Sequence, residues 1–305
     1  MTAHAETAAS SPYSAASAPV ARTFNADHYH FIEVRRASPF VGAYISGVDL
    51  SQPVSDAVFS EIETALAAHG VIFFRDQDLT PEQHIALATR FGEIDVNRFF
   101  RAVEGYPQIA EVRKEAGQKN NIGGGWHTDH SYDQIPATAS LLYARELPEL
   151  GGDTIFASTV AAFEALSPGL QKTLETLDAF HSSRHVFGAA AKAKANNDLG
   201  ERIGNAELAT QDAIHPVAFR HPLTGDKSLY VNPGFTLRIN GWTEQESQGL
   251  LSSLYEHIKK PEFAHRFAWE VGSLAIWDNR TTWHLAVNDY SGERRLLHRI
   301  TVRGR

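Results

Sequence analysis

The chain has 305 residues, of which 43% are hydrophobic and 21% charged, an ordinary composition for a globular protein with a sizeable core. Its formal net charge of −8 and the lack of a long basic run argue against nucleic acid as a main partner. No stretch approaches the roughly 20 apolar residues that span a bilayer, so no membrane association is expected. The chain has no cysteine, which excludes disulfides, zinc–thiolate sites and iron–sulfur clusters.

The N-terminal region differs in composition from the rest of the chain. Residues 1–22 are rich in Ala, Ser and Pro and are predicted to form a flexible tail outside the fold. They lack the basic start and apolar core of a secretory signal, so we expect a cytoplasmic protein. Residues 23–305 are predicted to form a single domain.

The helices are predicted from capping signals. Thr80-Pro81-Glu82-Gln83 combines an N-cap threonine, a proline at the first helical position and a capping-box glutamine. Similar signals are Ser55, Ser167-Pro168 and the full capping box Thr243–Glu246. The predicted helices cover residues 56–68, 81–91, 168–177 and a segment that begins at residue 244.

The remaining pattern is one of many short strands. They are predicted at residues 40–50, 71–74, 109–113, 138–145, 153–157, 213–220, 228–231, 266–271, 273–277, 281–286 and 296–302, with 180–186 also extended. Residues 114–125 read as a loop, and the insertion at 187–212 is either a mobile active-site lid or a surface loop. This order has no regular βαβ alternation. It predicts a mainly β fold with inserted helices, a jelly-roll or barrel-like sandwich.

The segment GGGWHTD, residues 123–129, places His127 and Asp129 two residues apart. On an extended segment both side chains would point to the same side, as two ligands of one metal must. A second histidine would complete a 2-His-1-carboxylate set for a first-row divalent metal. The bare spacing is expected about once by chance in such a chain, so it is only a hypothesis.

Polar residues near the C-terminus could complete this site. His284 ends an apolar run, although a lone histidine there is more often a structural residue with a hydrogen bond. Arg295 and Arg299 share a face of a predicted strand, about 13 Å apart. Two inward arginines need anions, which could belong to ligands or to the chain's own carboxylates. His130 and His298 would point the other way on extended segments and are not expected to be ligands.

The sequence resembles the iron(II)- and 2-oxoglutarate-dependent dioxygenases of the taurine dioxygenase type, which include alkylsulfatases and aryloxyalkanoate dioxygenases. The resemblance covers nearly the whole chain after residue 30. The segments that carry it, in family order, are AYISGVDL, VIFFRDQ, ATRFGEI, WHTD, ELPELGGDT, AAFEALSP, AIWDNR, WHLAVNDY and RRLLHRITVRG. It implies a double-stranded β-helix (jelly-roll, cupin-like) core, and Fe(II), 2-oxoglutarate and O2 as metal and co-substrates.

The resemblance also implies roles for individual residues. His127, Asp129 and His284 match the iron ligands. Thr154 and Arg295 match residues that bind 2-oxoglutarate, and Arg299 matches the arginine that holds the anionic group of the substrate. The implied reaction is hydroxylation of a small anionic substrate, coupled to decarboxylation of 2-oxoglutarate to succinate and CO2.

The chain departs from the taurine enzymes at positions that would meet the substrate. Asn97 and Phe100 replace a histidine and a tyrosine, Gly123–Gly125 precede the metal motif, and His130–Asp133 follow it. We therefore expect an apolar or aromatic substrate body, with Asn97, Phe100 and Tyr132 as candidate contacts. The aromatic residues could equally be ordinary core residues.

Other functions remain open from the sequence alone. A metal-dependent hydrolase could use the same His/Asp/His set to activate water, and a sensor could bind 2-oxo acids without catalysis. Within the family, taurine dioxygenase proper is the alternative to an aryloxyalkanoate-like carboxylate, an alkyl sulfonate or an alkyl sulfate as substrate. The resemblance also predicts a homo-oligomer, either a dimer or a tetramer.

Overall fold

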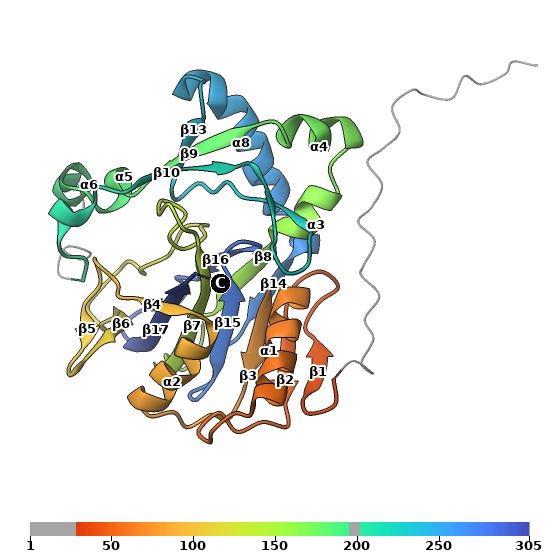
Figure 1. Cartoon of the computed structure of the whole chain (residues 1–305). Helices are drawn as coiled ribbons and strands as arrows, with labels where there is room; N and C mark the ends of the chain where they lie inside the picture. Colours follow the sequence, from red (N-terminus) through yellow and green to blue (C-terminus); the bar gives the residue numbers. More distant parts are fainter. Residues whose placement is uncertain (1–28, 195–201, 305) are drawn as a thin grey trace, which may run out of the picture.

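The computed structural model describes residues 29–194 and 202–304, apart from the side chains of 192–194. The predicted tail and residues 195–201 of the predicted lid therefore lie outside the described residues. Within them the architecture is mainly β with inserted helices, and two facing sheets form the jelly-roll core (Figure 1). The predicted fold class is confirmed.

The larger sheet forms the base of the molecule. Its strand order is β1-β2-β3-β15-β7-β17-β6-β5, with β4 paired to β17. All neighbours are antiparallel except β2 and β3. The strands are β1 (Glu33–Arg36), β2 (Ala43–Ser46), β3 (Val71–Phe74), β4 (Glu93–Asp95), β5 (Ala102–Val103), β6 (Tyr106–Lys114), β7 (Ala137–Glu146), β15 (Leu274–Asp278) and β17 (Arg295–Arg303).

The second sheet faces the first and has the order β14 (Ala264–Phe267), β8 (Thr154–Ser158) and β16 (Thr282–Ala286). Aromatic side chains fill the space between the two sheets. Phe73 on β3 stacks on Phe267 on β14 with ring centroids 4.1 Å apart, and Phe156 on β8 lies 5.6 Å from Trp277 on β15. This shared core fixes the distance between the sheets, and the candidate site lies at its end.

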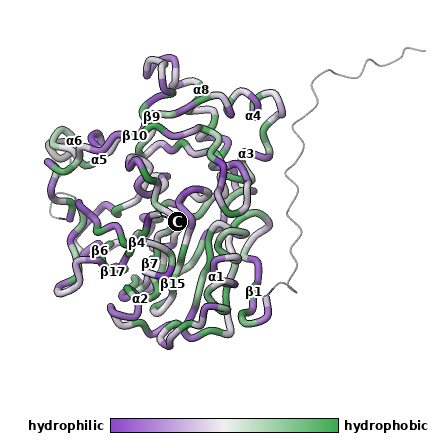
Figure 2. The backbone as a smooth tube through the Cα atoms, in the orientation of Figure 1, coloured by the Kyte–Doolittle hydropathy of each residue, from purple (hydrophilic) through white to green (hydrophobic). Residues whose placement is uncertain are grey.

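Two helices cover the other face of the larger sheet, α1 (Asp56–His69) and α2 (Pro81–Phe91) (Figure 1). Ser55 and Thr80 cap them as predicted, and Thr80 and Gln83 form the reciprocal capping box. β3 and β15 are buried on both faces, which explains why all of β3 and the first four residues of β15 are hydrophobic. The hydrophobic residues of the sheet and of the helices over it colour the lower part of the molecule green in Figure 2.

A third group of elements lies over one end of the two sheets (Figure 1). Its centre is a small sheet, β10 (Asp212–Pro216), β9 (Asp178–Ser182) and β13 (Thr236–Ile239), beside α8 (Glu244–Ile258). The other elements are α3 (Thr159–Glu164), α4 (Pro168–Leu174), α5 (Arg184–Phe187), α6 (Ala189–Lys194), η2 (Ala206–Leu208), β11 (Ala218–Arg220), β12 (Lys227–Leu229) and η3 (Pro261–Phe263). No helix in the described ranges is long and apolar enough to cross a membrane.

Several predicted boundaries were wrong. The extended segment predicted at 180–186 stops at Ser182, and the chain then forms α5, whose four residues are too few to show a helical repeat. The strand predicted at 213–220 is split at Val217 into β10 and β11, which belong to different sheets. The kinked strand predicted at 40–50 is reduced to β2, because Gly42 and Gly47 on either side have positive φ.

Phe73 provides a test of the core between the sheets. It is fully buried, so Phe73→Ala removes its contacts with Phe267 and leaves a cavity. We expect a loss of about 3–5 kcal/mol in the free energy of unfolding, measured by denaturant titration. Phe31→Ala is the matched control, because the Phe31 side chain is 56% exposed. Similar losses in both variants would contradict the packing described here.

Candidate active site

Two segments far apart in the sequence meet at a short backbone bridge. The N–H of His127 donates to the carbonyl of His284 (3.1 Å), and the N–H of His284 donates to the carbonyl of His127 (2.9 Å). His284 lies on β16, so this bridge adds the segment around His127 to the edge of the second sheet. The bridge brings the two imidazole rings to a centroid distance of 4.1 Å.

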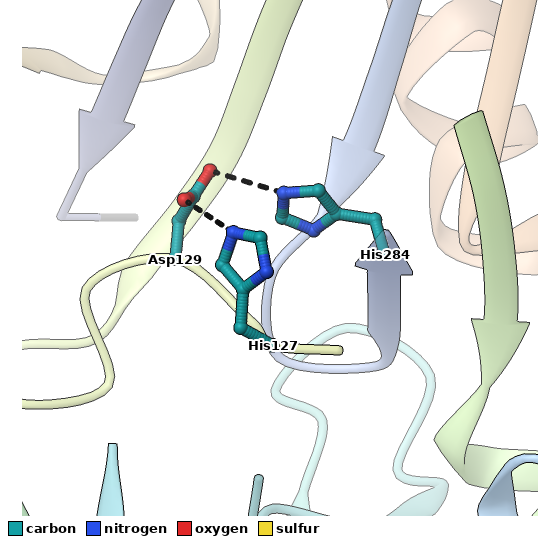
Figure 3. A group of neighbouring side chains, drawn as sticks. All are labelled: His127, Asp129 and His284. Atoms are coloured by element: carbon teal, nitrogen blue, oxygen red, sulfur yellow. Dashed lines mark ion pairs between the residues drawn. The ribbon is translucent and has the colours of Figure 1, made fainter. Parts of the chain in front are cut away.

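The three predicted metal ligands converge at this bridge (Figure 3). One ligand atom from each of His127, Asp129 and His284 lies within 4.8 Å of the others. The Nε2 atoms of His127 and His284 lie 3.8 and 3.9 Å from the two carboxylate oxygens of Asp129. The Nδ1 of His127 donates to the carbonyl of Gly125 (2.8 Å), so its Nε2 keeps a lone pair for a metal.

The electrostatics favour the protonation states that bind a metal. Burial alone would raise the pKa of Asp129, but Arg299 and the neighbouring histidines outweigh it and hold this pKa below its usual value. Burial lowers the pKa of His127 and lowers that of His284 well below its ordinary value. An ionised carboxylate between two neutral imidazoles is the form in which these groups act as ligands.

The chain turns directly after Asp129 instead of remaining extended. His130 has a φ of +55°, and its Nδ1 lies 2.9 Å from a carboxylate oxygen of Asp95 and 3.3 Å from one of Asp133. Arg98 pairs with both carboxylates. His130 thus lies outside the group of His127, Asp129 and His284, as expected. The cause is a turn at His130 and not the alternation of an extended segment. His298 also points away and accepts a hydrogen bond from Arg145.

One cavity of about 390 Å³ contains every residue predicted for the site. These residues are His127, Asp129, His284, Thr154, Arg295, Arg299, Asn97, Phe100 and Tyr132. The two arginines lie on the face of β17 that is turned towards the cavity. The structure therefore brings together the loop that precedes β7 and residues of β8, β16 and β17.

Arg295 is the more deeply enclosed of the two arginines. Its Nε donates to the carbonyl of Gly152 (2.9 Å), while its Nη2 is buried without a hydrogen-bond partner among the described residues. Burial lowers the pKa of Arg295 to about 10. Thr154 also lines the cavity, and its Oγ1 accepts a hydrogen bond from Trp269 (2.9 Å). A buried guanidinium with an unused donor is suited to a carboxylate ligand.

Arg299 lies next to the carboxylate of the metal site. Its Nη1 donates to Asp129 Oδ1 (3.0 Å), and its guanidinium carbon lies 4.7 Å from the ring centroid of Phe100. The Nε of Arg299 is buried and has no partner among the described residues. The sequence left open whether Arg299 binds a ligand or pairs with a carboxylate of the chain. It pairs with Asp129, and its Nε remains available as a donor to a ligand.

Aromatic side chains form one wall of the cavity, and Phe100 in this wall contacts Arg299. Phe100, Tyr132, Phe187 and Phe235 line the cavity, and Phe187 and Phe235 come from α5 and from the segment before β13. Phe99 is not at the surface of the cavity but stacks on Phe187 at 4.2 Å. The sequence did not reveal Phe187 and Phe235, because nothing local marks them as neighbours of Phe100.

Asn97 has a mainly structural position within this wall. Its side-chain oxygen accepts hydrogen bonds from the backbone N–H groups of Phe99 (2.9 Å) and Phe100 (2.8 Å), which forms a local turn.

The sequence did not identify Gly234 as part of the site. A Cβ atom there would lie 2.9 Å from the Cβ of His127, so only glycine allows this close approach.

Comparison with known proteins shows the family of the chain. Residues 33–301 match the model of the family described as taurine catabolism dioxygenase TauD, TfdA family. The chain belongs to this family. It is 34% identical to an alkylsulfatase of Acinetobacter baylyi, over 90% of this chain and 85% of that protein. It is 33% identical to an alpha-ketoglutarate-dependent sulfate ester dioxygenase of Pseudomonas putida, over 92% of both.

A solved structure gives the same result for the fold. The crystal structure of a taurine dioxygenase from Burkholderia xenovorans superposes with a TM-score of 0.75 at 35% identity, covering 90% of this chain and 92% of that one. The protein is thus a dioxygenase dependent on alpha-ketoglutarate (2-oxoglutarate), in a family that uses Fe(II) and O2. The His127, Asp129 and His284 side chains fit such a metal, since they offer two imidazoles and one carboxylate.

Metal binding can be tested without turnover. We expect Mn(II) at 100 times its Kd to stabilise the metal-free protein by about 2.7 kcal/mol, seen as a rise in Tm of several degrees. His284→Ala should lose most of this rise. His265→Ala is the control, since it changes a half-buried histidine outside the cavity. Equal rises in Tm for the wild-type protein, His284→Ala and His265→Ala would show that the metal binds elsewhere.

Proposed function

We propose that this dioxygenase hydroxylates a small organic anion with an apolar body, coupled to decarboxylation of 2-oxoglutarate to succinate and CO2. Candidate substrates are sulfate esters, alkyl sulfonates and aryloxyalkanoate-like carboxylates. The observation that carries this proposal is the single cavity in which a His/Asp/His group, two buried arginines and an aromatic wall meet. The two relatives named for sulfate ester chemistry support the sulfate esters.

His127, Asp129 and His284 would hold Fe(II) from one side. Bound there with 2-oxoglutarate, the metal would supply the activation of O2 that hydroxylation needs. Arg295 would hold the distal carboxylate of 2-oxoglutarate, using the Nη2 donor that has no partner in the described chain. Thr154, at the start of β8, lies beside the same cavity and would contact the co-substrate.

Arg299 would hold the anionic group of the substrate. Because Arg299 lies between Asp129 and Phe100, the anionic group would lie near the metal and the organic body against the aromatic wall. Phe100 and Tyr132 are the proposed substrate contacts, while the Asn97 side chain shapes the turn that presents Phe100. If the hydroxylated carbon carries a sulfate ester, the product would collapse to an aldehyde or ketone and release sulfate.

Taurine itself is a less suitable substrate for this cavity. Taurine carries an ammonium group in addition to its sulfonate. An aromatic wall in which the Asn97 side chain is already hydrogen-bonded to the backbone offers this ammonium group little hydrogen bonding.

A cytoplasmic location and a dimeric or tetrameric assembly remain predictions from the sequence.

Loss of a metal ligand should abolish the reaction. We expect His127→Ala to form no substrate-dependent succinate with Fe(II) and 2-oxoglutarate present, assayed against a panel of sulfate esters, sulfonates, aryloxy acids and taurine. His265→Ala is the control and should keep its activity. Near-normal turnover by His127→Ala would contradict the proposed ligand set.

The two arginines should affect different ligands. We expect Arg299→Ala to raise the KM for the organic anion by about 10-fold or more with little change in the KM for the co-substrate, because one charge-assisted pair is lost. Arg295→Ala should raise the KM for 2-oxoglutarate with little change in the KM for the organic anion. Saturating Fe(II) keeps metal occupancy constant, which matters because Arg299 also contacts Asp129. Equal effects of Arg299→Ala on both KM values would place it in the co-substrate site.

A further inference from the structure

A chain of buried hydrogen bonds ends on the carboxylate of Asp129. The hydroxyl of Ser140 donates to Asp129 Oδ2 (2.8 Å), and the Nδ2 of Asn279 donates to Ser140 Oγ (3.0 Å). The indole Nε1 of Trp277 donates to Asn279 Oδ1 (2.8 Å). All four residues are buried. The indole N–H and the amide NH2 group can only donate, and the carboxylate can only accept, so the direction of every hydrogen bond in this series is determined.

Strand register places these groups in one row. Ser140 on β7 lies directly opposite Trp277 on β15 and Thr301 on β17. Residues that lie opposite each other in antiparallel strands share a face of the sheet, and here that face is turned towards the cavity. Since the Ser140 hydrogen is used by Asp129, Thr301 is the donor in its 3.4 Å contact with Ser140. The position of Ser140 is thus fixed by three strands of the larger sheet.

The same row also contacts the rest of the metal site. The hydroxyl of Thr128, between His127 and Asp129, donates to the carbonyl of Asn279 (2.5 Å). The ring of Trp277 lies 4.6 Å from the ring of His284. Asn279 therefore contacts the segment that carries His127 and Asp129, and Trp277 packs beside His284.

We propose that Ser140 and Asn279 are positioning residues that fix the orientation of the Asp129 carboxylate for metal binding, with Trp277 holding Asn279 in place. Ser140 engages Oδ2 and Arg299 engages Oδ1, so both carboxylate oxygens have a hydrogen-bond donor. Two donors on different oxygens fix the plane of the carboxylate before a metal arrives. This inference rests on the proposed role of Asp129 as a metal ligand.

The test is a titration of the metal-free, full-length protein with Co(II), without 2-oxoglutarate or substrate. The readouts are the Kd and the visible absorption spectrum of bound Co(II), which reports the geometry of its ligands. We expect Ser140→Ala to weaken Co(II) binding by about 10–100-fold and to change the spectrum. Ser273→Ala is the matched control. Ser273 is equally buried but lies directly before β15, where its hydroxyl accepts hydrogen bonds from the Arg75 side chain and the backbone N–H of Glu270.

Asn279→Ala provides a second variant that leaves Ser140 in place. If the two residues act in one series, the double variant should bind Co(II) about as weakly as Ser140→Ala alone. A Kd within twofold of wild type in Ser140→Ala, or effects of the two changes that simply multiply, would overturn the proposal. A wild-type protein that binds no Co(II), or binding unchanged in His127→Ala, would instead overturn the metal site itself and the function proposed from it.

Discussion

The two-way backbone bridge between His127 and His284 is the constraint on which the site depends. It fixes two imidazoles from distant parts of the chain at the edge of the second sheet. Side-chain rotation alone then brings both Nε2 atoms towards Asp129. Glycine at position 234 leaves room for the His127 side chain, whose Cβ would lie 2.9 Å from a Cβ at that position. The turn after Asp129 directs His130 towards Asp95, and Asp133 pairs with Arg98.

β17 adds the second half of the site. Its alternation turns Arg295 and Arg299 towards the cavity and His298 towards the opposite face. The two arginines are not equivalent, because Arg295 donates to the carbonyl of Gly152 whereas Arg299 donates to the carboxylate of Asp129. The anion that Arg299 is proposed to bind would therefore lie close to the metal. The residue proposed to select the substrate would then lie next to the proposed site of oxidation.

Local signals in the sequence were enough for much of the fold. The capping boxes at Thr80 and Thr243 predicted the starts of α2 and α8, because the capping hydrogen bonds involve residues only three apart. The family resemblance placed His127 and His284 in one site, which spacing alone could not do. The cross-strand row of Trp277, Ser140 and Thr301 was not predicted, since it depends on the register of three strands. Phe187 was missed for a related reason: α5 is too short to have a recognisable pattern.

We propose that His127, Asp129 and His284 hold Fe(II) in a site that also binds 2-oxoglutarate. The most direct measurement is anaerobic absorption spectroscopy of the purified protein, with Fe(II) added first and 2-oxoglutarate second. We expect a visible charge-transfer band that appears only after the second addition and is absent in His127→Ala. No band in the wild-type protein, or the same band in that variant, would contradict it.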